Sequence, residues 1–295
     1  MLTGLSAFPL TPFRDDAVDE RAFVGLVERL ATAGVDSLAA LGSTGAYMYL
    51  DREERRRVAA AAVRHAGDVP VIVGIGAHRT AQVLAHADDA QQAGASALLL
   101  APVSYQRLTD DDVFGLFEDV SAAASVPVIV YDNPTTTHVS FTDDLHASIA
   151  RLPHVRSIKI PGVPGAADDA EARVRALRGR IPSDVTIGVS GDALAATGLV
   201  AGCDAWYSVV GGVLPEIALD LTRAARSGQH DAARQISARL QPLWDLFARH
   251  GGSYRVTAAV AEHLGLVAQE SLPRPLLGLD GPARAEVAAV VDGLR

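Results

Sequence analysis

Lys159 lies in a short β-branched run, Val155–Ile160, between Ile158 and Ile160, and Pro161-Gly162 ends the run. This pattern predicts a buried strand that carries one ammonium group near its carboxyl end. Burial in apolar surroundings disfavours the charged form of an amine, and the neutral form is the one that acts as a nucleophile. A lysine on an edge strand that faces water explains the same run, so the rest of the chain has to decide.

Three further segments place reactive groups directly after predicted strands. Gly42-Ser43-Thr44-Gly45 offers two hydroxyls and several backbone N–H groups as a compact acceptor for a carboxylate, although an ordinary polar turn has the same composition. Tyr131 opens Tyr131-Asp132-Asn133-Pro134, and a phenol can relay protons although its unperturbed pKa is about 10. Ser190-Gly191-Asp192 follows another strand, where Asp192 serves either as a helix N-cap or as a ligand contact.

The elements around these segments alternate between short apolar runs and longer helical patterns as far as about Gly228. A βα unit every ~30 residues predicts an α/β fold, a (β/α)8 TIM barrel. An open doubly wound sheet is the alternative, but no G-x-G-x-x-G follows the first strand. The predicted strands are Thr3–Phe8, Val35–Leu41, Pro70–Gly76, Ala95–Ala101, Pro127–Tyr131, Val155–Ile160, Val185–Val189 and Asp204–Val210.

Helical patterns fill the intervals, and they continue after the alternation stops. Gly34 ends the first helix, and acidic residues in the first turn open the second at Asp51. We expect residues 1–228 to form the barrel and residues 229–295 a C-terminal helical appendage packed on it. Its first helical pattern, with a kink at Pro242, has apolar residues at helical spacing: Ile236, Leu240, Leu243, Trp244 and Phe247. The predicted helices are Asp19–Ala33, one from Asp51, Arg79–Ala93, Thr109–Ala124, Thr142–Leu152, Ala166–Arg178, Asp192–Ala201, Ser253–Leu264 and Ala283–Leu294.

Closure of a barrel would bring the reactive segments to one mouth, because the carboxyl ends of all eight strands meet there. A neutral lysine, a tyrosine and an anion-binding loop then form one set. The amine attacks a 2-oxo acid, the loop holds the carboxylate of that acid, and the phenol moves protons through carbinolamine and enamine stages. This convergence favours the catalytic interpretation of Lys159 over the edge-strand one.

Composition limits the alternatives. A formal charge of −9 argues against nucleic acid or an anionic membrane as partner, and a single cysteine, Cys203, excludes an internal disulfide. The first ten residues lack the pattern of a signal peptide, and no apolar stretch reaches the ~20 residues that span a bilayer, so a cytoplasmic protein is expected. The histidines and carboxylates form no compact zinc pattern.

Other conspicuous side chains are interpreted as structural. Trp206 and Tyr207 are expected to pack in the eighth strand, although the backbone beside Tyr207 can reach a substrate, and Cys203 is a small buried filler. A group of histidines in helical patterns is expected at the surface: His65, His86, His146, His230 and His263.

Taken together, the motifs resemble the dihydrodipicolinate synthase / N-acetylneuraminate lyase family of class I aldolases over nearly the whole chain. The G-[ST]-T-G loop is Gly42–Gly45, the Y-[ND]-x-P motif is Tyr131–Pro134, and the [IV]-K strand ends in Ile158-Lys159. The S-G-D segment is Ser190–Asp192, and a helical appendage follows the barrel. Three motifs in the correct order make this a specific signal.

The resemblance implies a role for each matched residue. Lys159 would form the Schiff base, Tyr131 would relay protons, and Ser43 and Thr44, with Gly45, would contact the carboxylate and extend the relay. It also implies no metal or organic cofactor and a homotetramer. Gly191 and Tyr207 are further candidates for contact with the substrate.

Three departures from the family pattern concern the second substrate. Ala46 replaces a usual Glu after the loop. Thr136 stands where dihydrodipicolinate synthases carry an Arg for the carboxylate of the incoming aldehyde, and Arg107 is a candidate replacement. The family's second relay tyrosine, in a P-Y-Y segment, corresponds to Tyr105 with a one-residue uncertainty in register.

The sequence therefore predicts a lysine Schiff-base lyase for aldol condensation or cleavage with pyruvate or another 2-oxo acid. The alternatives are a 2-keto-3-deoxy-sugar-acid dehydratase or aldolase, a true 4-hydroxy-tetrahydrodipicolinate synthase, and a phosphate-ligand barrel. A catalytically silent member that only binds a 2-oxo acid is a further alternative. The retained Lys159 and Tyr131 argue against it, because a pure binder needs no imine-forming amine.

Overall fold

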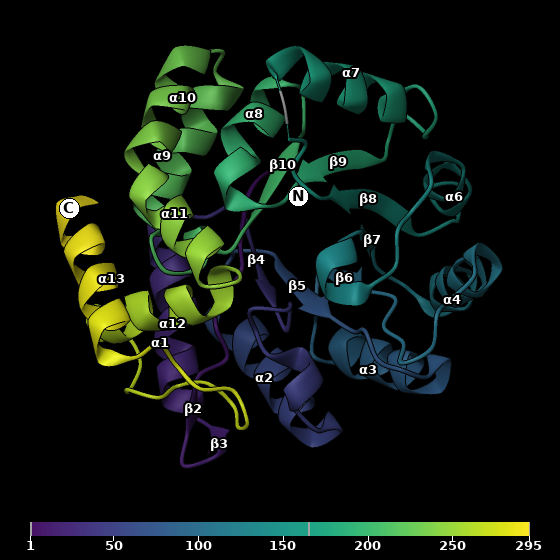
Figure 1. Cartoon of the computed structure of the whole chain (residues 1–295). Coiled ribbons are helices and arrows are strands. Elements are labelled where there is room, and N and C mark those ends of the chain that lie inside the picture. Colours follow the sequence, from purple (N-terminus) through teal and green to yellow (C-terminus); the bar gives the residue numbers. More distant parts are fainter. Residues whose placement is uncertain (1, 165, 295) are drawn as a thin grey trace.

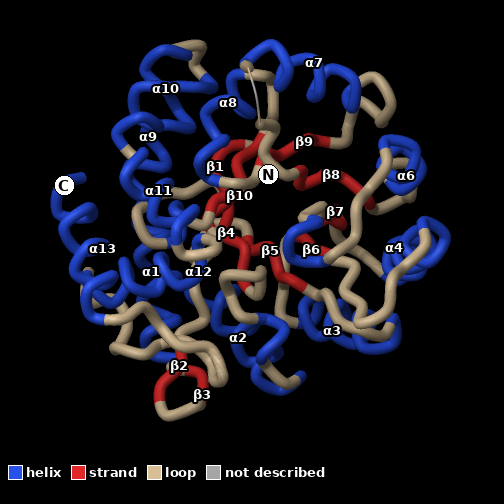
Figure 2. The backbone as a smooth tube through the Cα atoms, viewed as in Figure 1, coloured by secondary structure: helices blue, strands red, loops and turns tan. Residues whose placement is uncertain are grey.

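The computed structural model describes residues 2–164 and 166–294, and it has a closed barrel of eight parallel strands at its centre. The order around the barrel is β1-β10-β9-β8-β7-β6-β5-β4, and β4 closes on β1. Figure 1 shows the strands in the middle with helices around them, and Figure 2 shows the same arrangement by element type. The strands are β1 (Gly4–Ala7), β4 (Ser37–Ala40), β5 (Val71–Gly74), β6 (Ala97–Leu100), β7 (Val128–Tyr131), β8 (Val155–Ile160), β9 (Thr186–Val189) and β10 (Ala205–Ser208).

The barrel strands are short and apolar because the helices cover one face and the barrel interior the other. All four residues of β5, Val71–Gly74, are buried, as are all four of β6 and of β7. The register between β7 and β8 aligns Tyr131 with Lys159 at the carboxyl end of both strands. The sheet itself therefore brings these two side chains together.

Helices follow the strands, and their ends agree with the capping residues in the sequence. Asp51 and Thr109 each form a capping box, with Glu54 and Asp112 as the reciprocal partners. Gly34 ends α1 in the left-handed conformation, with φ of 75°. The barrel helices are α1 (Glu20–Ala33), α2 (Arg52–His65), α3 (Thr80–Gln92), α4 (Asp110–Ala123), α6 (Asp143–Ile149), α7 (Ala167–Arg178), α8 (Ala195–Val200) and α9 (Pro215–Arg226).

The predicted (β/α)8 barrel is confirmed. Strand β8 has the predicted bounds, and the other barrel strands are one to three residues shorter than the apolar runs. The elements that were not predicted include a small hairpin of β2 (Phe13–Arg14) and β3 (Ala17–Val18), and a short helix α5 (Pro134–Thr137). The hairpin turns at Asp15 and Asp16, both with positive φ, and nothing in its sequence alternates over enough residues to indicate strands. The predicted helix Asp192–Ala201 is divided into a 3-10 turn, η2 (Asp192–Leu194), and α8.

Four helices follow the barrel: α10 (His230–Arg239), α11 (Gln241–Arg249), α12 (Ser253–His263) and α13 (Gly281–Leu294). Instead of kinking one helix, Pro242 lies in the first turn of α11, where a missing N–H costs nothing. Helix α11 contacts η2, which follows the seventh barrel strand. The division of the chain into residues 1–228 and 229–295 remains an interpretation.

His146 does not lie at the surface, contrary to the prediction. Its side chain is fully buried, it stacks on Phe141 at a centroid distance of 5.0 Å, and its Nε2 lies 3.3 Å from Oδ2 of Asp132. The helical pattern of α6 has only seven residues, too few to reveal which face is buried. Cys203 and Trp206 are buried, as expected. Within the described part of the chain, no helix is long and apolar enough to cross a membrane.

Candidate active site

A cavity of about 670 Å³ opens at the carboxyl ends of the barrel strands, and Lys159 lies within it. Residues from both the barrel and the C-terminal helices form its walls, so the appendage helps to build the site. The barrel contributes Phe8, Ser43, Thr44, Tyr49, Tyr131, Asn133, Thr135, Thr136, Pro161, Gly162, Ser190, Gly191, Asp192, Ala193, Leu194, Tyr207 and Val209. Helices α11 and α12 and the turn between them contribute Trp244, Phe247, Ala248, His250, Gly251, Gly252, Ser253, Tyr254 and Arg255.

Lys159 has the environment of a nucleophilic amine. Its side chain is buried, and the cost of desolvating the ammonium lowers its pKa from the ordinary 10.5 to about 7. The carboxylates of Asp132 and Asp192 act in the opposite direction and keep the pKa from falling further. A substantial share of Lys159 is therefore neutral near pH 7, where an exposed lysine is almost fully protonated.

Tyr131 is in direct contact with this amine. The Nζ of Lys159 lies 4.1 Å from the centroid of the Tyr131 ring. The Tyr131 hydroxyl is 3.0 Å from Oγ of Ser43, and Nδ2 of Asn133 donates to it at 3.0 Å. Burial raises the pKa of Tyr131, which these two hydrogen bonds partly offset. The phenol is therefore protonated at neutral pH, with one donor and one hydroxyl partner in place.

Asn133 is held in turn by Thr135, whose Oγ1 donates to Oδ1 of Asn133 at 2.6 Å. Because the amide oxygen is occupied by this hydroxyl, the amide NH₂ group points to Tyr131. The Tyr131 oxygen accepts one hydrogen bond from the amide, so its own proton is available to Ser43. The chain Thr135–Asn133–Tyr131–Ser43 orients the phenol.

Asp192 is a buried carboxylate whose oxygens are already occupied. Its Oδ1 accepts from Nε1 of Trp206 at 3.0 Å and from the N–H of Val209 at 3.2 Å, and its Oδ2 accepts from the N–H of Val210 at 2.7 Å. Burial raises its pKa against these hydrogen bonds, which lower it. Asp192 caps no helix with its side chain. It joins the loops after β9 and β10 instead, so the predicted N-cap role is wrong. Asp192 also lines the cavity, and its contact with a ligand stays a prediction.

Tyr207, near the end of β10, also lines the cavity, and its position depends on a glycine. Its hydroxyl lies 2.7 Å from Oγ of Ser157 on β8, and its ring meets Phe8 edge-on at 6.1 Å. A Cβ atom at Gly188 would lie 2.2 Å from Cε2 of Tyr207. Only glycine at position 188 leaves room for this ring on the adjacent strand.

The structure brings most of the predicted site residues to the cavity. Those that line it are Lys159, Tyr131, Ser43, Thr44, Thr136, Gly191 and Tyr207. Gly45 lies in the same turn as Ser43 but does not line the cavity, and Ala46 follows it with a φ of 56°. Tyr105 is 93% exposed and also does not line the cavity, so within one chain it makes no part of this wall.

Several lining residues were missed from the sequence. Asn133 stands inside the Tyr131–Pro134 motif, and its distance of two residues from Tyr131 was the available signal. Trp244, Phe247 and Arg255 belong to the C-terminal helices, and a helical pattern does not show where a helix lies on a barrel. Arg107, the candidate replacement cation, is exposed and is not part of the cavity wall.

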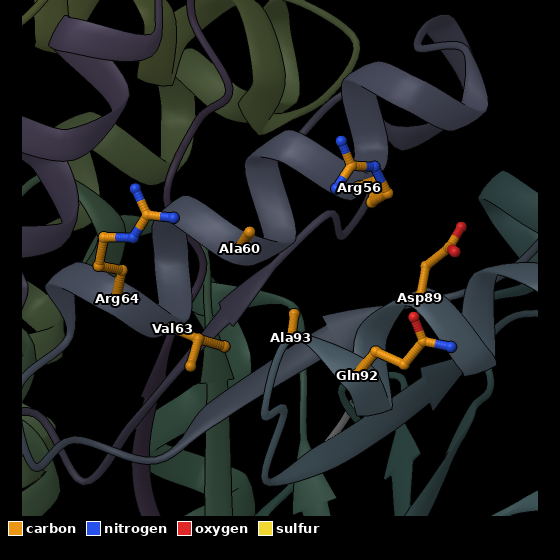
Figure 3. A pocket seen from close by; sticks show the side chains of 7 residues that line it. All are labelled: Arg56, Ala60, Val63, Arg64, Asp89, Gln92 and Ala93. Atoms are coloured by element: carbon orange, nitrogen blue, oxygen red, sulfur yellow. The ribbon is translucent and has the colours of Figure 1, made fainter.

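A second hollow, of about 400 Å³, lies between α2 and α3 (Figure 3). Its charged residues are mostly engaged already: Arg56 pairs with Glu53 at 2.7 Å, and Asp89 pairs with Arg52 at 2.7 Å. Among the residues that the structure describes, no group of three or more His, Cys, Asp or Glu side chains could hold a metal ion. The cavity around Lys159 is therefore the candidate active site.

Known proteins are similar to this chain in both sequence and structure. A model of the dihydrodipicolinate synthetase family matches residues 1–293. The chain belongs to this family. A 4-hydroxy-tetrahydrodipicolinate synthase of Phenylobacterium zucineum (strain HLK1) is 35% identical over 295 residues, which cover 99% of this chain and 97% of the relative.

Solved structures of the family have the same fold over the full length. A dihydrodipicolinate synthase from Agrobacterium tumefaciens str. C58 has a TM-score of 0.95 and 44% identity, covering 100% of this chain and 98% of that one. YagE from E. coli K12, solved in complex with pyruvate, has a TM-score of 0.89 and 25% identity, covering 99% and 98%. The resemblance drawn from the motifs is confirmed, and with it the enzyme class, a carbon–carbon lyase.

Proposed function

We propose that this dihydrodipicolinate synthetase family lyase forms a Schiff base between Lys159 and pyruvate, or another 2-oxo acid, and uses it for aldol condensation or cleavage. The observation that carries the proposal is the buried amine of Lys159, with a pKa of about 7, against a Tyr131 phenol hydrogen-bonded to Ser43. The complex of the relative YagE with pyruvate supports the choice of 2-oxo acid.

The proposed reaction begins with attack of the neutral amine on the C2 carbonyl. The carbonyl oxygen takes a proton from Tyr131, and the resulting carbinolamine loses water to give a protonated imine. Loss of a proton from C3 gives the enamine, whose C3 attacks the aldehyde carbon, and the new alkoxide takes a proton. Water then releases the product from Lys159. Cleavage follows the same steps in reverse.

Each proton transfer needs a group that both gives and takes protons, and Tyr131 is the candidate. Ser43 would pass the proton onward, and Asn133 would hold the phenol in place without exchanging protons. Thr44 and Gly191 are the proposed contacts for the 2-oxo acid, and Tyr207 and Thr136 those for the remainder of the substrate. Gly45, which does not line the cavity, stays a predicted contact. Tyr105 remains a predicted relay residue that the cavity of a single chain does not include.

A second candidate, 4-hydroxy-tetrahydrodipicolinate synthase, is favoured by the names of relatives such as the Phenylobacterium zucineum enzyme. This activity requires a cation for the free carboxylate of aspartate semialdehyde. Thr136 supplies only a neutral hydroxyl, and a charge-assisted contact is worth about 1.5–3 kcal/mol. Thr136 alone would therefore leave the condensation poor and favour neutral or hydroxylated aldehydes, unless another cation lines the cavity.

The test of the proposed function is reduction of the imine with borohydride. Pyruvate and borohydride should add one three-carbon unit to the chain, and peptide mapping should place it at Lys159. Lys159 is the only lysine in the sequence, so the α-amino group is the only other amine that can carry the label.

The control is Lys159→Arg, which should take up no label because a guanidinium stays protonated and cannot attack a carbonyl. Label on the α-amino group alone, or no label with any 2-oxo acid, would exclude the Schiff-base mechanism.

A further inference from the structure

Arg255 is a cation in the cavity wall that neither the motifs nor the proposed mechanism uses. It lies in the first turn of α12 and lines the same cavity as Lys159. Its Nε donates to the backbone oxygen of Leu277 at 3.0 Å, which fixes one side of the guanidinium. Within residues 2–164 and 166–294, Arg255 forms no ion pair, so no carboxylate occupies its two terminal NH₂ groups.

The charge of Arg255 is not cancelled by its neighbours in the cavity. Asp192 is the carboxylate among the described residues of the wall, and three N–H groups already occupy its oxygens. Tyr254 lies beside Arg255, but burial raises the pKa of its phenol and keeps it neutral. The guanidinium therefore presents a net positive charge to the cavity.

We propose that Arg255 binds the carboxylate of the second substrate at the end remote from the aldehyde. This inference rests on the proposed function, and it assigns that substrate to short aldehydes with a terminal carboxylate. A guanidinium has the planar fork that pairs with a carboxylate through two hydrogen bonds. Arg255 would then supply the cation that is missing because position 136 is a threonine. Arg107, the candidate from the sequence, lies outside the cavity wall.

The first turn of α12 adds to the same attraction. Gly252, Ser253 and Tyr254 also line the cavity, and Gly252 at the N-cap offers no side chain to the N–H groups that follow it. A helix N-terminus carries a partial positive charge, so a carboxylate beside Arg255 would be favoured by both. Thr136, which lines the same cavity, contributes only a neutral hydroxyl.

The test compares two aldehydes of equal chain length, succinic semialdehyde and butanal, of which only the first carries a carboxylate. The full-length enzyme is first reduced with pyruvate and borohydride, so that Lys159 is occupied and no turnover is needed. Calorimetric titration should show that succinic semialdehyde binds about 10–100-fold more tightly than butanal, the ratio expected for one charge-assisted contact.

Arg255→Met should abolish this preference while leaving the affinity for butanal within about threefold of wild type. Arg255→Lys should keep part of it, and Arg107→Met, the matched control, should keep all of it. Equal binding of the two aldehydes by the wild type, or loss of the preference in Arg107→Met, would overturn the assignment. Arg255→Gln gives a second neutral variant should the methionine variant fail to fold.

Failure of the proposed function gives a different result. A wild-type chain that takes up no label at Lys159 lacks the Schiff base, and the same titration on unreduced protein then reports on the Arg255 site alone. The Arg255→Met variant should be trapped with pyruvate as fast as wild type and should lose the preference for the carboxylate. This result supports both the Schiff-base function and the assignment of Arg255. A loss of trapping in Arg255→Met would assign Arg255 to the 2-oxo acid and contradict the inference.

Discussion

At the scale of single residues, the chemistry depends on one amine in an unusual environment. The sequence contains 26 Lys and Arg residues together, and only Lys159 is a lysine. Its burial between β7 and β9 lowers its pKa to about 7, because an ammonium loses its hydration there. Arginine cannot be neutralised in this way, since its pKa is far higher.

The pKa of Lys159 gives a pH dependence with a defined sign. Only the neutral amine attacks, and its fraction rises as the pH increases through 7. The initial rate of pyruvate trapping at subsaturating pyruvate should therefore rise about eightfold from pH 5.5 to 6.5 and level off above pH 8. Quenched-flow labelling with mass detection measures it. A rate that keeps rising to pH 10 would indicate an ordinary, solvated lysine.

Tyr131 should be needed for proton transfer but not for folding. Tyr131→Phe removes the hydroxyl that contacts Ser43 and Asn133 and leaves the ring beside Lys159. Turnover should fall by about 10²–10⁴-fold, the usual contribution of a general acid–base group, with the circular dichroism spectrum unchanged. Ser43→Ala should cause a smaller loss if Ser43 only passes the proton along. Unchanged turnover in the phenylalanine variant would assign Tyr131 to packing.

At the scale of elements, the strands position the reactive groups, and most of this was predictable. Continuous apolar runs such as Val128–Tyr131 identify buried strands, and barrel topology then places their ends at one mouth. The β7–β8 register pairs Tyr131 with Lys159. It could not be predicted from the sequence, because hydrogen bonds between the two strands set it and the apolar pattern of each strand does not. His146 shows the same limit, since a seven-residue helix is too short for its pattern to define a buried face.

Gly188 on β9 provides a test of how strands position the site. A methyl group there would enter the Tyr207 ring, so Gly188→Ala should push the ring toward the cavity and destabilise the fold by about 1–3 kcal/mol. Urea denaturation should show the lower free energy of unfolding, and the rate of pyruvate trapping should differ from that of the wild type.

The matched control for Gly188→Ala is Gly115→Ala in α4, where nothing lies within 4 Å of the new methyl group. It should stabilise the chain by about 0.5–1 kcal/mol, because alanine is the better helix former. If both alanine variants trap pyruvate at the wild-type rate, Tyr207 does not depend on Gly188.

At the scale of the whole molecule, the sequence predicted the barrel but not where the C-terminal helices lie. Hydrophobic spacing identified Trp244 and Phe247 as parts of a helix, yet both turn out to line the cavity. Their placement, and that of Arg255, follows from packing between helices and barrel loops far apart in the chain. Such contacts leave no local pattern, which is why the part of the cavity wall that these helices form was found only in the structure.

The oligomeric state is the remaining prediction at this scale. The family resemblance implies a homotetramer, and several large apolar side chains are exposed on the single chain: Tyr105 (93%), Leu277 (61%), Tyr49 (47%) and Met48 (38%). Light scattering coupled to size exclusion should give four times the chain mass of 30.8 kDa. Tyr105→Ser should weaken the assembly if Tyr105 lies in an interface, and an unchanged tetramer in that variant would place it elsewhere.

Closure of the barrel has a consequence for the order in which the protein is made. Gly4 on β1 pairs with Ala205 on β10. Strand β1 therefore cannot pair with β10 until almost all of the barrel has left the ribosome. Pairings this distant along the chain form slowly. We expect the amine of Lys159 to stay solvated and protonated, and so a poor nucleophile, until the strands around it have paired. The nascent chain would then acquire its nucleophile only late in synthesis, when β1 and β10 can close the barrel.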